Sequence, residues 1–191
     1  ILTARKSWQV WDAASGMLLS APVKHRNEIR HVRFSFDSQL VISTSVDETA
    51  RVFDAASGEP ACPPLLHDFA VHSGSFAIRG DTVLTRTANQ VTRLWKLPSN
   101  AADSRALNNT GPVRRAEFSR DGHRMLTASV DGTARLWDAA TGAHLRTVPH
   151  EDAVMDAAFS SDGRLVVTSS QDRTARIWNA NWSRSWTTAT P

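Results

Sequence analysis

Residues 129–138 read Ser-Val-Asp-Gly-Thr-Ala-Arg-Leu-Trp-Asp, and this pattern returns along the chain. It recurs as Ser-Val-Asp-Glu-Thr-Ala-Arg-Val-Phe-Asp at 45–54 and as Ser-Gln-Asp-Arg-Thr-Ala-Arg-Ile-Trp-Asn at 170–179. The aromatic residue near the end of each repeat keeps intervals of 42, 42, 42 and 41 residues, at Trp11, Phe53, Trp95, Trp137 and Trp178. A repeat that spans the chain predicts a row of similar units, each supported by its neighbours, in place of one or two ordinary domains.

Each unit alternates short β-prone stretches with tight turns. In the last unit we expect strands at 154–160, 165–170 and 174–178, because Asp-Gly at 162–163 and Asp-Arg at 172–173 favour turns between them. The preceding unit adds a fourth strand at 143–148. Four antiparallel strands form one twisted sheet, which cannot bury both of its faces alone and therefore stacks on its neighbours. The fold class expected is all-β.

The same residues resemble a WD repeat: His150, then 159–163, then 170–178, with the copies at 129–138 and 45–54 in register. The wording is similar to that of bacterial members of the family. The resemblance implies a partial β-propeller with about four to four and a half four-stranded antiparallel blades. The expected repeats are 1–24 (incomplete, with its N-terminal part missing), 25–66, 67–108, 109–149 and 150–191, the last with an irregular end.

Length and composition set further bounds. The 191 residues hold fewer blades than the family's propellers usually have, so we expect a fragment that needs further blades or self-association to close the propeller. Cys62 is the only cysteine, which excludes an intrachain disulfide and fits a cytoplasmic location. No apolar run approaches the roughly 20 residues that cross a bilayer, so no membrane partner is expected.

His150, Ser170 and Asp172 have the residue types of a hydrolase triad. The chain lacks a nucleophile elbow and a Gly-rich oxyanion loop, and the trio recurs once per repeat, so we expect no catalytic residue. The resemblance instead implies a buried hydrogen-bond network that also includes Trp178. Its expected members in the other repeats are Ser129, Asp131 and Trp137; His25, Ser45 and Asp47; and His67, Thr87 and Trp95.

No cofactor or metal is expected. His25, His67 and His150 fall at equivalent places in different blades, and the other histidines lack the spacing of metal ligands. No Gly-rich nucleotide loop is present. One arginine per repeat, two residues before the aromatic, is expected to stack on the sheet or form a surface ion pair: Arg51, Arg93, Arg135 and Arg176.

The family resemblance also implies where partners bind, namely at three positions per repeat on the narrower face of the propeller. These positions are Glu28, Arg30 and Val46; Ala70, His72 and Ala88; Pro112, Arg114 and Val130; and Ala153, Met155 and Gln171. The alternative interpretation is that these positions form an ordinary solvent-exposed rim with no role in binding.

The function expected is a non-catalytic scaffold that binds partner proteins or peptides through its loop faces. One alternative is an accessory propeller of a larger signalling enzyme, such as a bacterial serine/threonine kinase. A nucleic-acid platform is less favoured, because the net charge is only +3 and the basic group at 114–124 lacks interleaved exposed aromatics.

Overall fold

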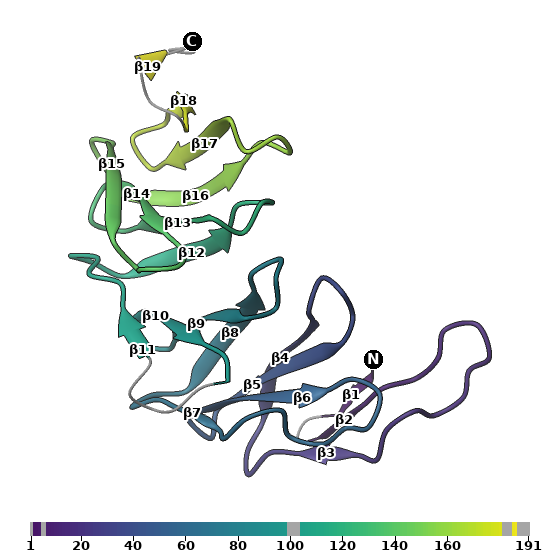
Figure 1. Cartoon of the computed structure of the whole chain (residues 1–191). Helices are drawn as coiled ribbons and strands as arrows, with labels where there is room; N and C mark the ends of the chain where they lie inside the picture. The colour runs from purple at the N-terminus through teal and green to yellow at the C-terminus, as the bar shows by residue number, and fades with distance from the viewer. Residues whose placement is uncertain (1, 5–6, 99–103, 181–184, 187–191) are drawn as a thin grey trace. The chain divides into compact units, whose positions relative to one another are not determined.

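The computed structural model describes residues 2–4, 7–98, 104–180 and 185–186, and all regular structure in them is β-strand. The strands form four four-stranded sheets and one three-stranded sheet, in which neighbours in sequence pair antiparallel (Figure 1). The expected all-β fold of partial propeller blades is therefore confirmed. Because the described residues contain no helix, none of them forms a helix that could cross a membrane.

We number the sheets as blades 1 to 5. Blade 1 contains β1 (Leu2–Ala4), β2 (Ser7–Gln9) and β3 (Val23–Lys24). Blade 2 contains β4 (Ile29–Phe34), β5 (Leu40–Ser45), β6 (Thr49–Asp54) and β7 (Leu65–Leu66). Blade 3 contains β8 (Val71–Phe76), β9 (Thr82–Thr87), β10 (Thr92–Lys96) and β11 (Ser104–Ala106). Blade 4 contains β12 (Val113–Phe118), β13 (Arg124–Ser129), β14 (Thr133–Asp138) and β15 (His144–Pro149). Blade 5 contains β16 (Val154–Phe159), β17 (Leu165–Ser170), β18 (Ala175–Asn179) and β19 (Ser185–Trp186).

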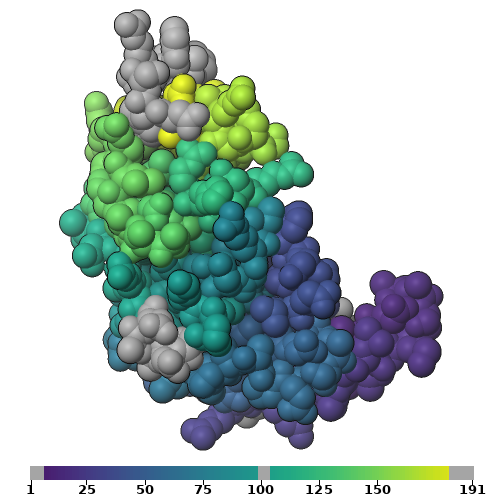
Figure 2. Space-filling view, in the orientation of Figure 1, coloured from purple at the N-terminus to yellow at the C-terminus, as the bar shows by residue number. Residues whose placement is uncertain are grey.

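The blades belong to two compact units. Unit 1 comprises residues 1–89 and 93–105, which hold blades 1 and 2 and most of blade 3. Unit 2 comprises residues 90–92 and 106–191, which hold blades 4 and 5. In unit 1, the segment around residues 11–21, drawn in purple, projects from the other residues of the unit (Figure 2).

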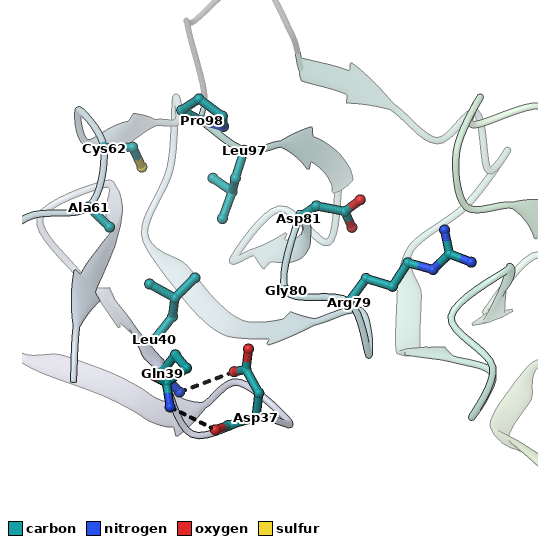
Figure 3. A pocket seen from close by; sticks show the side chains of 10 residues that line it. All are labelled: Asp37, Gln39, Leu40, Ala61, Cys62, Arg79, Gly80, Asp81, Leu97 and Pro98. Carbon is teal, nitrogen blue, oxygen red and sulfur yellow. Dashed lines mark hydrogen bonds between the residues drawn. The ribbon is translucent and has the colours of Figure 1, made fainter. Parts of the chain in front are cut away.

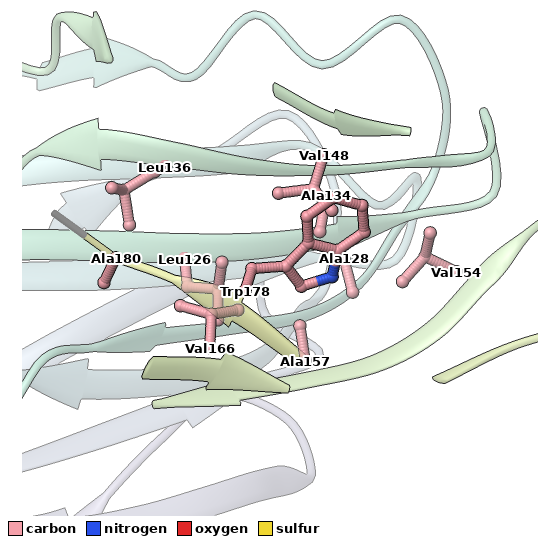
Figure 4. Packing of buried hydrophobic residues seen from close by; sticks show 10 residues of the cluster. All are labelled: Leu126, Ala128, Ala134, Leu136, Val148, Val154, Ala157, Val166, Trp178 and Ala180. Carbon is pink, nitrogen blue, oxygen red and sulfur yellow. The ribbon is translucent and has the colours of Figure 1, made fainter. Parts of the chain in front are cut away.

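In unit 2 the core lies in the seam between blades 4 and 5. Leu126 and Leu136 lie on the face of blade 4 toward blade 5, which we call its outer face, and Val154, Val166 and Trp178 of blade 5 cover them (Figure 4). Side chains alternate between the two faces of a strand, so each sheet places one apolar row toward each neighbour. Burial of these rows is the main stabilising contribution to the unit.

The seam between blades 2 and 3 repeats this arrangement in unit 1. Ile42 and Val52 are covered by Val71, Val83 and Trp95, and all five side chains are buried. A third cluster joins blades 1 and 2 through Trp8, Val10, Val23, Val41, Phe53 and Ala55.

The outer face of blade 5 has the same composition but is exposed. Val167 and Ile177 pair across β17 and β18, and each side chain is 44% exposed. Their equivalents in blade 4, Leu126 and Leu136, are 1% and 3% exposed. Closure by further blades or by self-association stays a prediction.

Gly74 in β8 marks a close approach in the seam between blades 2 and 3. A Cβ built on Gly74 would lie 2.7 Å from Ile42 Cδ1 and 3.0 Å from Thr44 Cγ2. The equivalent residue of blade 5 is Ala157, and its seam has Leu126 in place of Ile42 and Ala128 in place of Thr44.

We predict that Gly74→Ala lowers the free energy of unfolding by about 1–3 kcal/mol through overpacking. This loss is larger than the roughly 0.4–1 kcal/mol of stabilisation that alanine gives over glycine by lowering the conformational entropy of the unfolded chain. Urea denaturation measures the change, and Thr44→Ala in the same protein should restore part of the loss. Unchanged stability of Gly74→Ala would show that the seam is not tightly packed there.

Candidate functional site

Blade 5 contains the most complete hydrogen-bond network of the described residues, which we call the polar network. His150 Nδ1 lies 2.8 Å from Asp172 Oδ2, and His150 Nε2 lies 2.7 Å from Thr168 Oγ1. Trp178 Nε1 donates to the same threonine oxygen at 2.9 Å. We assign the histidine proton to Nδ1, because that nitrogen faces the carboxylate. Every donor then points the same way, from indole through hydroxyl and imidazole to carboxylate, and each buried polar group is satisfied.

The prediction that Ser170 supplies the hydroxyl of this network is wrong. Ser170 Oγ donates to the Asp152 carbonyl at 2.9 Å and accepts from Asp172 N at 3.1 Å, so it belongs to the turn. Thr168 lies two residues earlier on the same face of β17, and the imidazole reaches this position. The same correction applies to Ser45, Thr87 and Ser129, whose places are taken by Ser43, Thr85 and Thr127.

The sequence has a hydroxyl-bearing residue at both of these positions, the one in the network and the one at the turn. Every complete blade carries a hydroxyl at the deeper position, at residues 43, 85, 127 and 168, and another at the turn, at residues 45, 87, 129 and 170. Because strand periodicity places both on one face, the pattern could not choose between them.

In blade 2 the network lacks its indole donor. His25 Nδ1 lies 2.9 Å from Asp47 Oδ2 and Nε2 lies 2.7 Å from Ser43 Oγ, as in blade 5. Phe53 replaces the tryptophan and packs edge-on against Trp8, with ring centroids 5.3 Å apart.

In blade 3 the acidic end is rebuilt. His67 Nε2 lies 2.8 Å from Thr85 Oγ1, which also accepts from Trp95 Nε1 at 2.8 Å. The other ring nitrogen, Nδ1, donates to the Leu65 carbonyl at 3.0 Å. Asn89, which stands in place of the turn aspartate, accepts instead from Thr87 Oγ1 at 2.5 Å.

Blade 4 replaces the histidine with two residues. Asn109 Oδ1 accepts from Thr127 Oγ1 at 3.0 Å, and Trp137 Nε1 donates to that hydroxyl at 3.0 Å. Thr110 Oγ1 donates to Asp131 Oδ2 at 2.5 Å and so supplies the bond that an imidazole makes elsewhere.

The recurrent arginines form the expected ion pairs. Arg176 and Arg135 approach Asp172 and Asp131 at 3.4 and 3.1 Å. Arg51 lies 3.8 Å from Asp47 in the same way. Arg93, whose blade has Asn89 at the turn, instead pairs with Asp68 at 3.3 Å.

Burial and hydrogen bonding fix the charge states of the network. Burial opposes ionisation of Asp47, but donors from Thr49, Arg26 and His25 outweigh it and lower its pKa to about 2. Burial lowers the pKa of His67 to about 4. Burial also lowers the pKa of His25, against the opposing effect of Asp47. At neutral pH both imidazoles are therefore uncharged.

These contacts argue against a triad at His150. Ser170 bonds the Asp152 carbonyl and not the imidazole, and Thr168, which does contact it, is only 1% exposed. A substrate could not reach that hydroxyl, so this network has a structural role. Within the described ranges, no three His, Cys, Asp or Glu side chains lie close enough to hold a metal ion.

We predict that Thr168→Val lowers the free energy of unfolding more than Ser170→Ala does. The valine removes the bonds that His150 Nε2 and Trp178 Nε1, both buried, make to Thr168 Oγ1, at a cost of about 1–3 kcal/mol for each group. The serine change removes two bonds at a half-buried turn, one to the Asp152 carbonyl and one from Asp172 N, and both of these groups belong to the backbone. Denaturant unfolding of the two variants measures the order, and the reverse order would restore Ser170 to the network.

We predict that stability falls as the pH is lowered from about 6.5 to about 4, because the unfolded protein binds protons that buried His67 excludes. The stabilisation is fully present above the unfolded pKa, and the difference in pKa corresponds to about 3 kcal/mol. His67→Asn, which copies Asn109 of blade 4, should reduce this slope. Unfolding free energies at several pH values test it, and an unchanged slope would assign the dependence to other groups.

One of the residues expected to bind partners in each complete blade lies at a β-bulge at the start of that blade. The register between the first two strands shifts between Ile29 and His31, and likewise in the other blades between Val71 and Ser73, Val113 and Arg115, and Val154 and Asp156. A bulge adds one residue to a strand and re-aims its side chain. The added residues are Arg30, His72, Arg114 and Met155, all exposed.

The neighbouring predicted positions differ in exposure. Glu28, Val130, Gln171, Ala88 and Pro112 are exposed, whereas Val46 and Ala70 are partly buried. Ala153, in the loop before β16, is only 4% exposed, so its side chain is not available for contact with a partner. We call the bulged residues with Glu28, Val46, Val130 and Gln171 the rim, which has one part in each unit.

In unit 1, Arg30 and Arg86 lie near His72 of the rim. Partial burial and the nearby Arg86 and Arg30 lower the pKa of His72. Arg30 also pairs with Glu28, at 3.7 Å between side chains that are about half exposed. In unit 2 the rim combines Arg114 with the apolar side chains of Met155 and Val130.

Comparison with protein-family models gives three matched stretches, residues 17–54, 105–138 and 142–179, to the family described as WD domain, G-beta repeat. Together they cover more than half of the chain and leave out 55–104, which contains β8, β9 and β10 of blade 3. A search of curated proteins found no match to this chain.

Proposed function

Because the chain belongs to the WD40 family, whose domains are typically non-catalytic modules for protein–protein interaction, we propose that the rim is where this protein binds partner proteins or peptides. The observation that supports the proposal is the bulge at one equivalent position of every complete blade. Buried seams fix the remaining residues of the sheets, whereas the bulged residue is exposed and varies from blade to blade.

The chemistry of the rim favours different contacts in the two units. Arg30, with Arg86 nearby, gives the rim of unit 1 a cationic group that suits an acidic side chain of a partner. Arg114 beside Met155 and Val130 suits a partner with mixed apolar and acidic side chains. An arginine and a methionine are residue types enriched in the centres of protein interfaces.

We predict that peptides selected from a displayed library against the whole chain lose at least about tenfold in affinity when a rim residue that they contact is truncated. The variants are Arg30→Ala and His72→Ala in unit 1, and Arg114→Ala and Met155→Ala in unit 2. Binding is measured by titration calorimetry. These side chains are exposed, so the melting temperature should stay unchanged.

Asp162→Asn is the matched control, because it changes an exposed turn at the other end of blade 5. Selected peptides that bind all four rim variants as tightly as the unmodified protein would contradict the proposal.

A further inference from the structure

A cavity of about 330 Å³ lies between blades 2 and 3 of unit 1, at the ends of the blades opposite the rim. Its volume is at the lower end of the roughly 300–1,000 Å³ typical of ligand pockets. Leu40 and Leu97 point toward one another across it, and Arg79 points away (Figure 3). Asp37 and Asp81 also line it, each from a turn between the first two strands of a blade.

The seam between blades 4 and 5 shows what fills this place elsewhere in the same chain. Arg124 stands at the start of β13, as Leu40 does at the start of β5. Its guanidinium crosses the seam: Nη1 donates to the Ala180 carbonyl at 3.2 Å and Nη2 donates to the Gly163 carbonyl at 2.8 Å. It also lies 5.8 Å from the centre of the Phe159 ring.

The residues that receive Arg124 have counterparts around the cavity. Leu97 corresponds to Ala180, because each donates its amide back to the turn residue before the second strand, at 2.7 and 2.6 Å. Gly80 corresponds to Gly163, because both close the first turn with positive φ, 72° and 68°. Phe76 corresponds to Phe159, and pairs with Val83 as Phe159 pairs with Val166.

The equivalent position of unit 1 lacks the cation, because Leu40 stands in place of Arg124. The side chain of Leu40 has no hydrogen-bond donor, so it cannot make the two bonds to carbonyls that the Arg124 guanidinium makes. Leu40, Cys62, Phe76 and Leu97 pack instead at the edge of the core cluster and leave the cavity between the blades.

Two carboxylates at the cavity add charge that suits a cation. Asp37 Oδ1 accepts from Ser35 Oγ at 2.6 Å and from Gln39 N at 3.1 Å, and these bonds hold the pKa of Asp37 below its ordinary value. A Cβ placed on Gly80 would lie 3.9 Å from Asp37 Oδ2, so the ionised carboxylate of Asp37 in blade 2 faces the turn of blade 3. The corresponding Asp121 of blade 4 lies 4.0 Å from Arg124 Nη2.

We propose that this cavity is a second binding site, which takes an arginine side chain of a partner protein or peptide. The guest guanidinium would occupy the place that Arg124 occupies between blades 4 and 5. Its planar set of donors suits two carbonyls and a carboxylate, which a lysine ammonium matches less well. The aliphatic part of the guest would lie against Leu40 and Leu97. The site goes beyond the proposed function, because the rim plays no part in it.

The test uses the whole chain and a short blocked alanine peptide with one central arginine, followed by amide NMR. We expect saturable shifts at Gly80 and Leu97, and binding at least about tenfold weaker for the same peptide with citrulline, a neutral isostere. Asp81→Asn should weaken binding about two- to fivefold, whereas Asp68→Asn, the same charge change at the other end of unit 1, should not. Shifts elsewhere only, or equal binding of the citrulline or lysine peptide, would overturn the proposal.

Substitutions that exchange the two seams test the equivalence directly. Leu40→Arg should fill the cavity from within and abolish binding of the peptide, and a folded Leu40→Arg protein that still binds would overturn the proposal. Arg124→Leu should open the second seam, so that the peptide also shifts Gly163 and Ala180. If Leu40→Arg fails to fold, the Asp81→Asn and citrulline comparisons decide. Arg30→Ala and His72→Ala should leave peptide binding unchanged, which separates this site from the rim.

Discussion

The structure depends on one constraint: a four-stranded sheet has two apolar faces, and each must be covered by another sheet. Leu126 and Leu136 are buried only because Val154, Val166 and Trp178 of the following blade lie on them. Ile42 and Val52 depend on blade 3 in the same way. The tight packing of these seams limits which side chains can be substituted. Gly74 shows how little room the seam between blades 2 and 3 leaves.

The polar networks solve a second problem that the seams create. A histidine before the first strand must be buried as the blades stack, and burial favours its neutral form. A neutral imidazole needs both a donor and an acceptor partner. Blades 2 and 5 meet this need with an aspartate and a hydroxyl, blade 3 with a backbone carbonyl, and blade 4 with an asparagine and a threonine. Different side chains therefore satisfy one requirement for hydrogen bonding.

Several departures from the repeat lie in blade 3, beside the cavity. Ala77 and Arg79 replace the serine and aspartate that bond each other in the first turns of blades 2, 4 and 5, and Leu97 replaces an alanine. The first three strands of this blade lie outside the stretches that match the family. The cavity forms where these changes meet Leu40, which stands where blade 4 has a bridging arginine.

The sequence by itself determined the blade architecture, because a repeat with β-strand periodicity and tight turns leaves few other folds. The family resemblance placed His150, Asp172 and Trp178 in one network, and the repeat predicted that the recurrent arginines stack on the sheet or form ion pairs. Only the tertiary structure decided that Thr168 rather than Ser170 completes the network, since both lie on one face of the strand and only the reach of the imidazole separates them. The bulges and the cavity likewise depend on pairing between strands and on contact between blades, which no pattern within one repeat records.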